Sequence, residues 1–315
     1  MRKLLKYTVA TAVESGLVDL AVQSLDGTRV AANAAGDRTY DAEGLQRLLD
    51  RVEVAIEELE AQNEGGDEAA PAHLPDELRR AQALRQRVHD AMSRLSHNHT
   101  KINLTDRDAN LMKGRDGVMP GYNAQAMVSP LNRDTGTERV IITAADVVTN
   151  ASDSEQLVPM LEQAEATTGY RSPVTLADGG YHTAAALDAG DSRGQVLVMG
   201  ERYEKYYARP YFKDRFRYEA DNDVYVCPHG QRLRFIGLRK SKVTGIRDYR
   251  LYRASRTACR TCPAYGSCTR DKHSGRALWV TSSDMLLLRH REWMRTSEAA
   301  ALYRRRRELS EPTSV

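Results

Sequence analysis

Residues 174–181 read VTLADGGY, a short apolar run that ends in an aspartate followed by two glycines. Apolar and β-branched residues favour a buried strand, and glycine directly after the acid allows the backbone to open toward a crevice. The same arrangement occurs at residues 17–28, LVDLAVQSLDGT. Carboxylates at the strand ends of an α/β sheet point toward the crevice in which ligands bind. Both stretches therefore predict functional acids, Asp26 and Asp178, although Asp before Gly is also ordinary turn chemistry.

The remaining pattern extends these strands into a mixed α/β sheet with helices on its faces. Runs with helical spacing of apolar residues alternate with β-compatible runs. Residues 63–75 are rich in Gly, Pro and charge, and they separate two helices that we expect to form a hairpin. Residues 150–153 offer N-capping side chains for a later helix. The expected elements are helices at 3–15, 41–62, about 76–95, about 153–168, 183–189 and about 284–311, and strands at 17–25, 121–129, 138–149, 174–177 and 195–199.

This order divides the chain into consecutive segments, because a helical insertion and a Cys-rich stretch interrupt the alternating pattern. The expected segments are 1–40 with the N-terminal helix and first strand, 41–100 as a helical insertion, 101–200 as the remainder of the sheet core, 201–280 as a basic Cys-rich insertion, and 281–315 as a C-terminal helix.

The charge of the chain is unevenly distributed along its 315 residues, although the formal net charge is only +3. Residues 41–80 carry 12 acids and 4 Lys or Arg, whereas residues 201–276 carry 19 Lys or Arg and 8 acids. A long basic segment favours a polyanionic partner, although a solvated basic face is the alternative. No apolar run is long enough to cross a bilayer and no signal peptide is visible, so we expect a cytoplasmic protein without membrane partners.

The cysteines lie within the basic segment, with the spacing C-x31-C-x2-C-x5-C. Thiols are reduced in the cytoplasm, which favours metal binding over disulfides. A pair separated by two residues is ordinary zinc-knuckle geometry, and four thiolates would complete a structural Zn²⁺ site. His229 could replace one thiolate, and four reduced thiols without metal are the alternative. The candidate zinc ligands are Cys227, Cys259, Cys262 and Cys268.

Basic and aromatic residues alternate at the start of the same segment. This alternation suits phosphate contacts combined with base stacking, although the edge of a small β-insertion has the same composition. The candidate DNA-binding residues here are Lys205, Arg209, Lys213, Arg215 and Arg217.

Two strand-end aspartates also fit a site for a hard cation. Mg²⁺ prefers a few carboxylates together with water and substrate phosphate, and a third acid on a helix beside the sheet would complete that set. Two ions held in this way activate the attacking oxygen and stabilise the leaving oxygen in phosphodiester exchange.

Several stretches resemble bacterial insertion-sequence transposases of the DDE type, which belong to the RNase H-like superfamily. The resemblance is to a subgroup with a helical insertion after the first strand and a Cys-rich insertion. It extends over nearly the whole chain in the order of the family. The matching stretches are SGLVDLAVQSLDGTRVAANAA (16–35), LTDRDANLMKGRDGVMPGYNAQAMVSP (104–130), ITAADVVTNASDSEQLVPMLEQA (142–164), TLADGGYHTAAAL (175–187), ASRTACRTCPAYGSCT (254–269) and REWMRTSEAAALYRRRRELSEP (291–312).

The resemblance implies three carboxylates that hold Mg²⁺ or Mn²⁺. The first is the Asp of Asp-Gly-Thr, Asp26, and the second precedes Gly-Gly-Tyr, Asp178. The third is a Glu in a Tyr…Arg…Glu-Pro context near the end of an Arg-rich helix, which places it at Glu311, with Glu308 as the competitor.

Further residues of the same helix are candidates for DNA contact. The resemblance places basic residues beside the carboxylates, where they would hold DNA phosphates next to the metal ions; a solvated helix end is the alternative. These candidates are Tyr303, Arg304 and Arg307.

The implied function is metal-dependent cleavage of DNA strands and their transfer to a target, carried out by a possible homodimer. Family members extend further at both ends, so we expect a chain truncated at both termini. An inactive remnant that at most binds DNA is the alternative function, and a zinc-ribbon interaction module is a third class.

Overall fold

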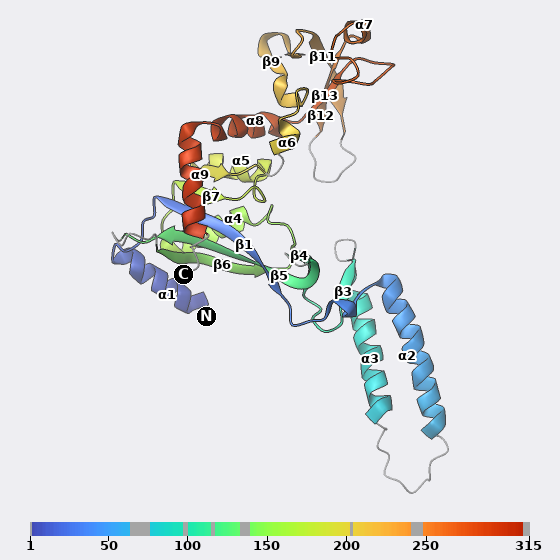
Figure 1. Ribbon diagram of the computed structural model, residues 1–315. Helices are drawn as coiled ribbons and strands as arrows, with labels where there is room; N and C mark the ends of the chain where they lie inside the picture. Colours follow the sequence, from blue (N-terminus) through green and yellow to red (C-terminus); the bar gives the residue numbers. More distant parts are fainter. Residues whose placement is uncertain are drawn as a thin grey trace. The chain divides into compact units, whose positions relative to one another are not determined.

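The computed structural model describes residues 2–63, 76–96, 100–114, 117–132, 139–201, 204–240 and 248–310 (Figure 1). Nearly all of the expected linker at 63–75 and the candidate Glu311 lie outside these ranges. The chain divides into two compact units. One, here called the core unit, contains residues 1–26, 127–144 and 154–315; the other, the hairpin unit, contains residues 27–126 and 145–153.

The central sheet has the strand order β4-β5-β1-β7-β8, and β6 also pairs with β5. β1 pairs in parallel with β7, and β7 with β8, whereas β4 and β5 are antiparallel. This confirms the expected mixed α/β sheet flanked by helices. The elements are β1 (Val22–Ala31), β4 (Asn110–Gly114), β5 (Gly117–Pro130), β6 (Val140–Val148), β7 (Val174–Ala177) and β8 (Val196–Met199), with α1 (Arg2–Glu14), α4 (Leu157–Thr168) and α5 (Ala184–Arg193).

Successive residues of each strand point to opposite faces of the sheet, and each face of the core unit carries an apolar layer. Leu25 and Ala177 pack with residues of α4 and α5 on one face. Val22, Leu176 and Val198 lie on the other face, where they pack with the C-terminal helices. Because successive strand residues point to opposite faces, Asp26 and Asp178 belong to the second face.

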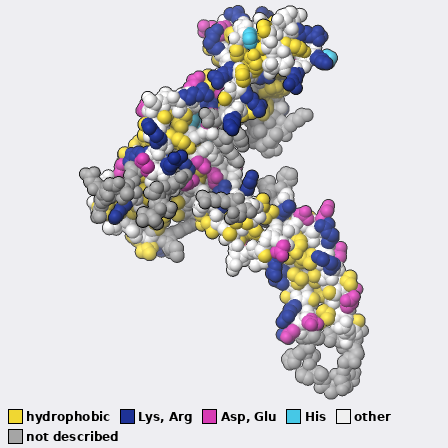
Figure 2. All heavy atoms as spheres, viewed as in Figure 1, with side chains coloured by type: hydrophobic (Ala, Val, Ile, Leu, Met, Phe, Trp, Pro, Cys, Tyr) yellow, Lys and Arg dark blue, Asp and Glu magenta, His cyan; other side chains and the backbone are white. Residues whose placement is uncertain are grey.

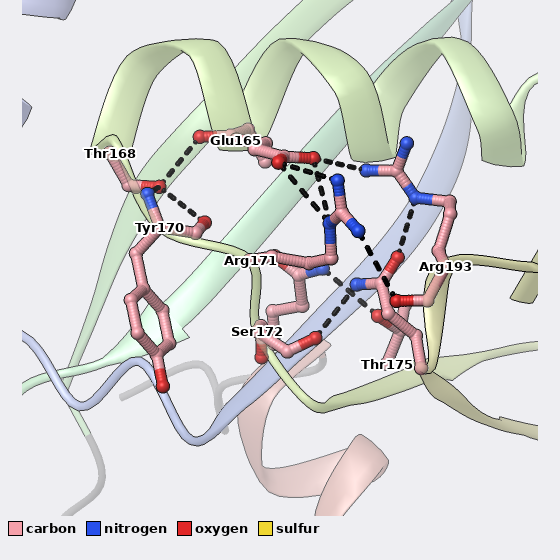
Figure 3. A network of polar contacts seen from close by, with 10 residues as sticks. Glu165, Thr168, Tyr170, Arg171, Ser172, Thr175 and Arg193 are labelled. Carbon is pink, nitrogen blue, oxygen red and sulfur yellow. Dashed lines mark hydrogen bonds and ion pairs between the residues drawn. The ribbon is translucent and has the colours of Figure 1, made fainter.

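A polar network ties the beginning of β7 to the ends of α4 and α5 (Figure 3). Glu165 accepts hydrogen bonds from Arg171 at 2.9 Å and Arg193 at 2.5 Å. Arg193 also donates to Gln195, whose amide in turn donates to the carbonyl of Ser172 at 2.7 Å. The hydrogen bond from Arg171 lowers the pKa of Glu165, and both arginines favour its charged form. This network fixes the start of β7, and Asp178 directly follows the end of this strand.

The Cys-rich segment forms a separate antiparallel sheet in the order β13-β12-β11-β10-β9. Tyr225, Leu233, Tyr252 and Leu278 form its small core with Cys259. The elements are α6 (Glu204–Tyr207), β9 (Arg217–Glu219), β10 (Val224–Val226), β11 (Arg232–Arg239), β12 (Tyr249–Ala254), α7 (Arg256–Arg260) and β13 (Ala277–Val280).

The hairpin unit contains the expected pair of helices, α2 (Ala42–Asn63) and α3 (Asp76–Arg94), above a short ladder of β2 (Thr39–Asp41) and β3 (Lys101–Asn103). Leu45, Leu49 and Val88 form its apolar seam. None of the helices within the described ranges is both long and apolar enough to cross a membrane.

The expected end of the first strand is wrong. β1 starts at Val22 instead of residue 17 and continues past Asp26 to Ala31. A hydrogen bond to β5 holds the end of this longer strand, because the amide of Ala32 donates to the carbonyl of Pro120 at 2.9 Å. Gly121 permits this close approach, since a Cβ there would lie 2.5 Å from the carbonyl oxygen of Val30.

The single C-terminal helix expected at 284–311 is also wrong. The chain forms α8 (Ser282–Met294) and then α9 (Ser297–Ser310), which run in different directions (Figure 1). Thr296 interrupts the helix, because its hydroxyl accepts a hydrogen bond from the amide of Ala299 at 3.3 Å. That is the capping arrangement that starts a new helix.

The expected capping by residues 150–153 is wrong as well, because α4 starts at Leu157. Asp153 instead accepts hydrogen bonds from Arg29 at 3.0 Å, Asn123 at 2.7 Å and Gln125 at 3.0 Å. Burial opposes ionisation of Asp153, but these partners outweigh it and lower its pKa. Asp153 is therefore the anionic centre of a polar cluster within the hairpin unit.

Candidate active site

The register of β1 and β7 brings the two predicted aspartates together. Leu25 is the partner of Ala177 in the parallel ladder, so Asp26 on β1 and Asp178, the first residue after β7, each follow a paired residue at the same edge of the ladder. Adjacent strands are separated by about 4.8 Å, and side chains in register on parallel strands point to the same face. Both aspartates are half-buried. The fold thus places two carboxylates side by side on the second face of the sheet.

α9 packs against this face and contacts β7 and β8 (Figure 1). Leu309 is buried there with Val22 and Leu176. At the end of the helix, the hydroxyls of Ser310 and Ser24 lie 2.6 Å apart. Because Ser24 and Asp26 share one face of β1, the end of α9 lies next to the predicted site.

Arg306 is the basic residue of α9 that reaches the aspartates. Its guanidinium lies 3.4 Å from Asp26 Oδ1, and its side chain is 13% exposed. The sequence candidates on this helix are Arg304 and Arg307, and Arg307 is exposed. Arg304 is exposed and donates to the carbonyl of Ala300 on its own helix at 3.4 Å.

Tyr303 also lies close to both aspartates. Burial raises its pKa, the charges of Asp178 and Asp26 act in the same direction, and Arg306 and Arg307 oppose them. Its phenol is therefore protonated at neutral pH and can donate a hydrogen bond. Tyr303 and Arg306 thus lie on the face of the sheet that carries the two aspartates.

Asp178 is oriented by its own turn. The amide of Gly180 donates to Asp178 Oδ1 at 2.7 Å. Tyr181 follows this turn and is fully buried, so it anchors the loop in the core. The expected Asp-Gly-Gly turn thus has a definite role, which is to direct the carboxylate of Asp178.

His182 follows the same turn but is poorly suited to bind phosphate as a cation. Burial lowers its pKa to about 4, and His290 and Arg291 act in the same direction. Its imidazole is therefore neutral at physiological pH.

Gly200 follows β8 and lies against the ring of Tyr303. A Cβ at Gly200 would lie 2.2 Å from the phenol oxygen, which is closer than any real contact. Replacing Gly200 with alanine is therefore expected to displace Tyr303 and to lower the free energy of unfolding by about 1–3 kcal/mol, the usual cost of overpacking. Urea denaturation measures this change. Adding Gly200→Ala to a Tyr303→Ala chain, which lacks the clashing ring, should lower the free energy of unfolding less than it does in the wild-type chain. An equal decrease in both backgrounds would contradict the contact between Gly200 and Tyr303.

The candidate third carboxylate, Glu311, lies outside the described residues. Its competitor Glu308 is described and is exposed on α9. Within the described ranges, no three Asp, Glu, His or Cys side chains already lie together as metal ligands. The structure therefore describes the paired aspartates but not a complete set of three acids.

The DNA-binding candidates of the Cys-rich segment have different environments. Lys213 forms an ion pair with Asp284, and Arg217 forms one with Glu219 at 2.8 Å. Arg209 lies over the ring of Tyr206 at 4.6 Å. The side chains of Lys205 and Arg215 are exposed.

The register of the sheet places three further arginines on the same face as the sequence candidate Arg217. Arg234 pairs directly with Arg253, and Arg232 lies in one row with Val226 and Arg217. Residues opposite each other in an antiparallel ladder point to the same face, and residues two apart on one strand also share a face. Arg217, Arg232, Arg234 and Arg253 therefore form what we call the arginine face. The alternation in Arg232-Leu233-Arg234 was the signal for it.

The four cysteines come together from two turns of this sheet, and all four are free thiols. They line one small cavity of about 20 Å³. Burial raises the pKa of the Cys268 thiol, and the other three thiols act in the same direction, which requires that they lie close by.

Comparison with known families identifies the C-terminal part of the chain. Residues 226–314 match the family model described as "Transposase DDE domain". This match includes β11 to α9 and supports a DDE transposase; Asp26 and Asp178 lie before it. No curated protein and no solved structure gives a match.

Proposed function

We propose that this DDE transposase cleaves DNA strands and transfers them to a target with divalent metal ions held by Asp26, Asp178 and Glu311. The observation that carries the proposal is the register of β1 and β7, which makes the two aspartates neighbours beside α9. No finding within the described residues favours the alternative of an inactive remnant.

The chemistry of the donor set fits a hard cation. Carboxylate oxygens are the protein ligands that Mg²⁺ and Mn²⁺ prefer, and such sites also take oxygens from water and substrate phosphate. The hydrogen bond from Gly180 fixes one oxygen of Asp178 and thereby limits its rotation. Arg306 reduces the repulsion between the two carboxylates through its contact with Asp26.

Glu311 is a suitable third ligand because of its covalent neighbour. Ser310 contacts Ser24, which lies two residues before Asp26 on the same face of β1. Two residues of a strand span about 6.6 Å, and consecutive Cα atoms are about 3.8 Å apart. The described part of α9 therefore ends beside the strand that carries Asp26, one residue before the proposed third ligand. Glu308 is the less suitable candidate, because it lies two residues before Ser310, on another side of the helix.

When bound, the metal ions would activate the attacking oxygen and stabilise the leaving oxygen of the phosphodiester. The three carboxylates would hold these ions, and Arg306 and Arg307 would attract the scissile phosphate. Tyr303, protonated at neutral pH, would donate a hydrogen bond to a phosphate oxygen. Gly200 and Leu309 would keep α9 in place, so that these side chains stay near the paired aspartates.

We propose the arginine face as a contact surface for the DNA backbone. The side chains of Arg217 and Arg232 are 71% and 63% exposed, and Arg234 is exposed as well. Glu219 is the acid that pairs with Arg217 and Arg232. Lys and Arg side chains are also visible over the Cys-rich sheet in Figure 2. Guanidinium groups bind phosphates through bidentate hydrogen bonds.

Replacing both Arg232 and Arg234 with alanine should weaken DNA binding without changing the fold. Binding driven by phosphate contacts falls linearly on a log–log plot against salt, with a slope of about −0.9 per contact for duplex DNA. The double variant should therefore lower the magnitude of the slope by about 2. Gel-shift titrations between low and moderate salt measure this slope. The charge-matched control is the double variant R47A/R51A, which removes two exposed arginines of α2. An unchanged slope in R232A/R234A would exclude the arginine face.

The proposed activity is tested with the whole chain and a supercoiled plasmid that carries the genomic segments flanking its coding sequence. We expect nicked and strand-transferred products in the presence of Mg²⁺ or Mn²⁺ and none with EDTA. Products that form equally well with EDTA, or DNA binding with no cleavage in either metal, would contradict the proposal.

A further inference from the structure

We infer that the four cysteines of the Cys-rich sheet bind one structural zinc ion through their thiolates. The inference is independent of the proposed transposase activity, because it concerns a site within β9 to β13 and α7. It rests on the two turns that carry the cysteines, on the hydrogen bonds to their sulfur atoms and on the small core that they complete.

The first turn joins β10 to β11. Its sequence is Cys227-Pro228-His229-Gly230, and the amide of Gln231 donates to Cys227 Sγ at 3.3 Å. The amide of Gly230 closes the turn onto the carbonyl of Cys227 at 2.8 Å, with Gly230 at a φ of 77°. Hydrogen bonds of this kind to a ligand atom orient it for metal binding.

The other three cysteines lie in α7, which contains Cys259, and in the turn that follows it. Cys259 Sγ accepts a hydrogen bond from the amide of Arg276 at 3.3 Å. The amide of Cys262 bonds to the carbonyl of Cys259 at 3.3 Å, and the amide of Cys268 bonds to that of Ala264 at 2.8 Å. The backbone therefore holds the cysteines by hydrogen bonds that do not depend on a bound ion.

Both turns face the same cavity, which all four cysteines line. Zn²⁺ in structural sites is bound tetrahedrally by four thiolates or by thiolates and imidazoles. Each cysteine has a single torsion, χ1, between its backbone and its sulfur atom. Within the described residues no three of these side chains are already grouped as ligands, so binding requires the sulfur atoms to turn toward the shared cavity.

The size of this sheet gives the zinc ion a structural purpose. Its core consists of Phe216, Tyr225, Leu233, Tyr252 and a few smaller residues, and β9 and β10 are three residues long. Modules with so small a core usually require a metal ion or disulfides for stability. The four thiols here are free, so a metal ion is the cross-link that this sheet can form.

His229 lines the same cavity but is not proposed as a ligand. It is exposed, and its Nε2 atom lies 3.3 Å from the phenol oxygen of Tyr211, on whose ring it stacks. Four cysteines already complete a tetrahedral site without an imidazole. His229→Ala is therefore the matched control for the cysteine variants.

The test measures the metal content of the full chain purified without chelators. We expect stoichiometric zinc in the wild-type chain and in His229→Ala, and loss of most of it in Cys259→Ser and Cys268→Ser. Loss of zinc from His229→Ala would show that the imidazole of His229 is a ligand and would overturn the set of four thiolates. Retention of zinc by both cysteine variants would overturn the site.

Because the cysteine variants could unfold, a second measurement uses the wild-type chain alone. After the bound metal is removed, Co²⁺ is added and the visible spectrum is recorded. Tetrahedral thiolate ligation should produce strong d–d bands and a sulfur-to-cobalt charge-transfer band, both abolished by zinc. A folded wild-type chain that takes up neither zinc nor Co²⁺ in this form would refute the inference.

Discussion

The variant Asp178→Asn is expected to lose metal-dependent DNA cleavage by at least about a thousandfold, while it retains DNA binding. A bound ion contributes several kcal/mol of transition-state stabilisation, and each 1.4 kcal/mol corresponds to a factor of ten. Asparagine has nearly the same shape as aspartate and can still accept the hydrogen bond from Gly180, so the turn should persist. The rate of plasmid nicking in Mg²⁺ measures the loss.

The control for this variant is Asp188→Asn. Asp188 lies on α5 ten residues further along the chain, is exposed, and undergoes the same change of charge. It should cleave DNA at the wild-type rate. If Asp178→Asn cleaves within tenfold of the wild-type rate, Asp178 is not a metal ligand, and the assignment fails whatever the result for Asp26.

Replacing Arg291 with alanine is expected to lower the free energy of unfolding by about 3–5 kcal/mol, the cost of removing one partner of a buried ion pair. Arg291 is 3% exposed and forms two hydrogen bonds with Asp214, at 2.7 and 2.8 Å. It also lies over the ring of Tyr207 at 4.4 Å. These contacts attach the segment before β9 to α8. Urea denaturation measures the difference.

The control is the exposed ion pair between Arg289 of α8 and Asp191 of α5. Its side chains are 68% and 56% exposed, so Arg289→Ala should change the free energy of unfolding by at most about 1 kcal/mol. The double variant D214L/R291M should recover part of the loss, because Asp214 is no longer left as a buried charge without its partner, while Glu201 still loses its contact with Arg291 at 3.5 Å. If Arg291→Ala lowers the free energy of unfolding no more than Arg289→Ala does, the ion pair between Arg291 and Asp214 does not stabilise the attachment of the segment before β9 to α8.

Local patterns in the sequence were sufficient to predict most elements of the fold. The run VTLADGGY predicts both β7 and the turn that orients Asp178, because strand propensity and glycine after an acid act over a few residues. The helical hairpin follows from apolar spacing in α2 and α3. The break between α8 and α9 was not predicted, although Thr296 and Ser297 are capping residues in the middle of a helical pattern and were a local signal for it.

The arrangement of the candidate site depends on contacts between distant parts of the chain. Asp26 and Asp178 are neighbours because β1 pairs with β7 in one register, and local patterns do not specify that pairing. The choice of Arg306 over Arg304 depends on the rotation of α9, which Leu309 determines by packing against Val22 and Leu176. The polar cluster around Asp153 was missed for the same reason, since its partner Arg29 is distant in the sequence.

The most direct test of the central claim, that Asp26 and Asp178 jointly hold a divalent cation, is a titration with Mn²⁺ in which EPR detects the free ion. We expect the wild-type chain to bind Mn²⁺ and both Asp26→Asn and Asp178→Asn to bind it at least about tenfold more weakly, since even indirect partners of a metal change affinity by that much. Asp19→Asn is the control, because Asp19 lies near Arg305 at 3.8 Å and outside the site. Undiminished Mn²⁺ binding in both site variants would contradict the account.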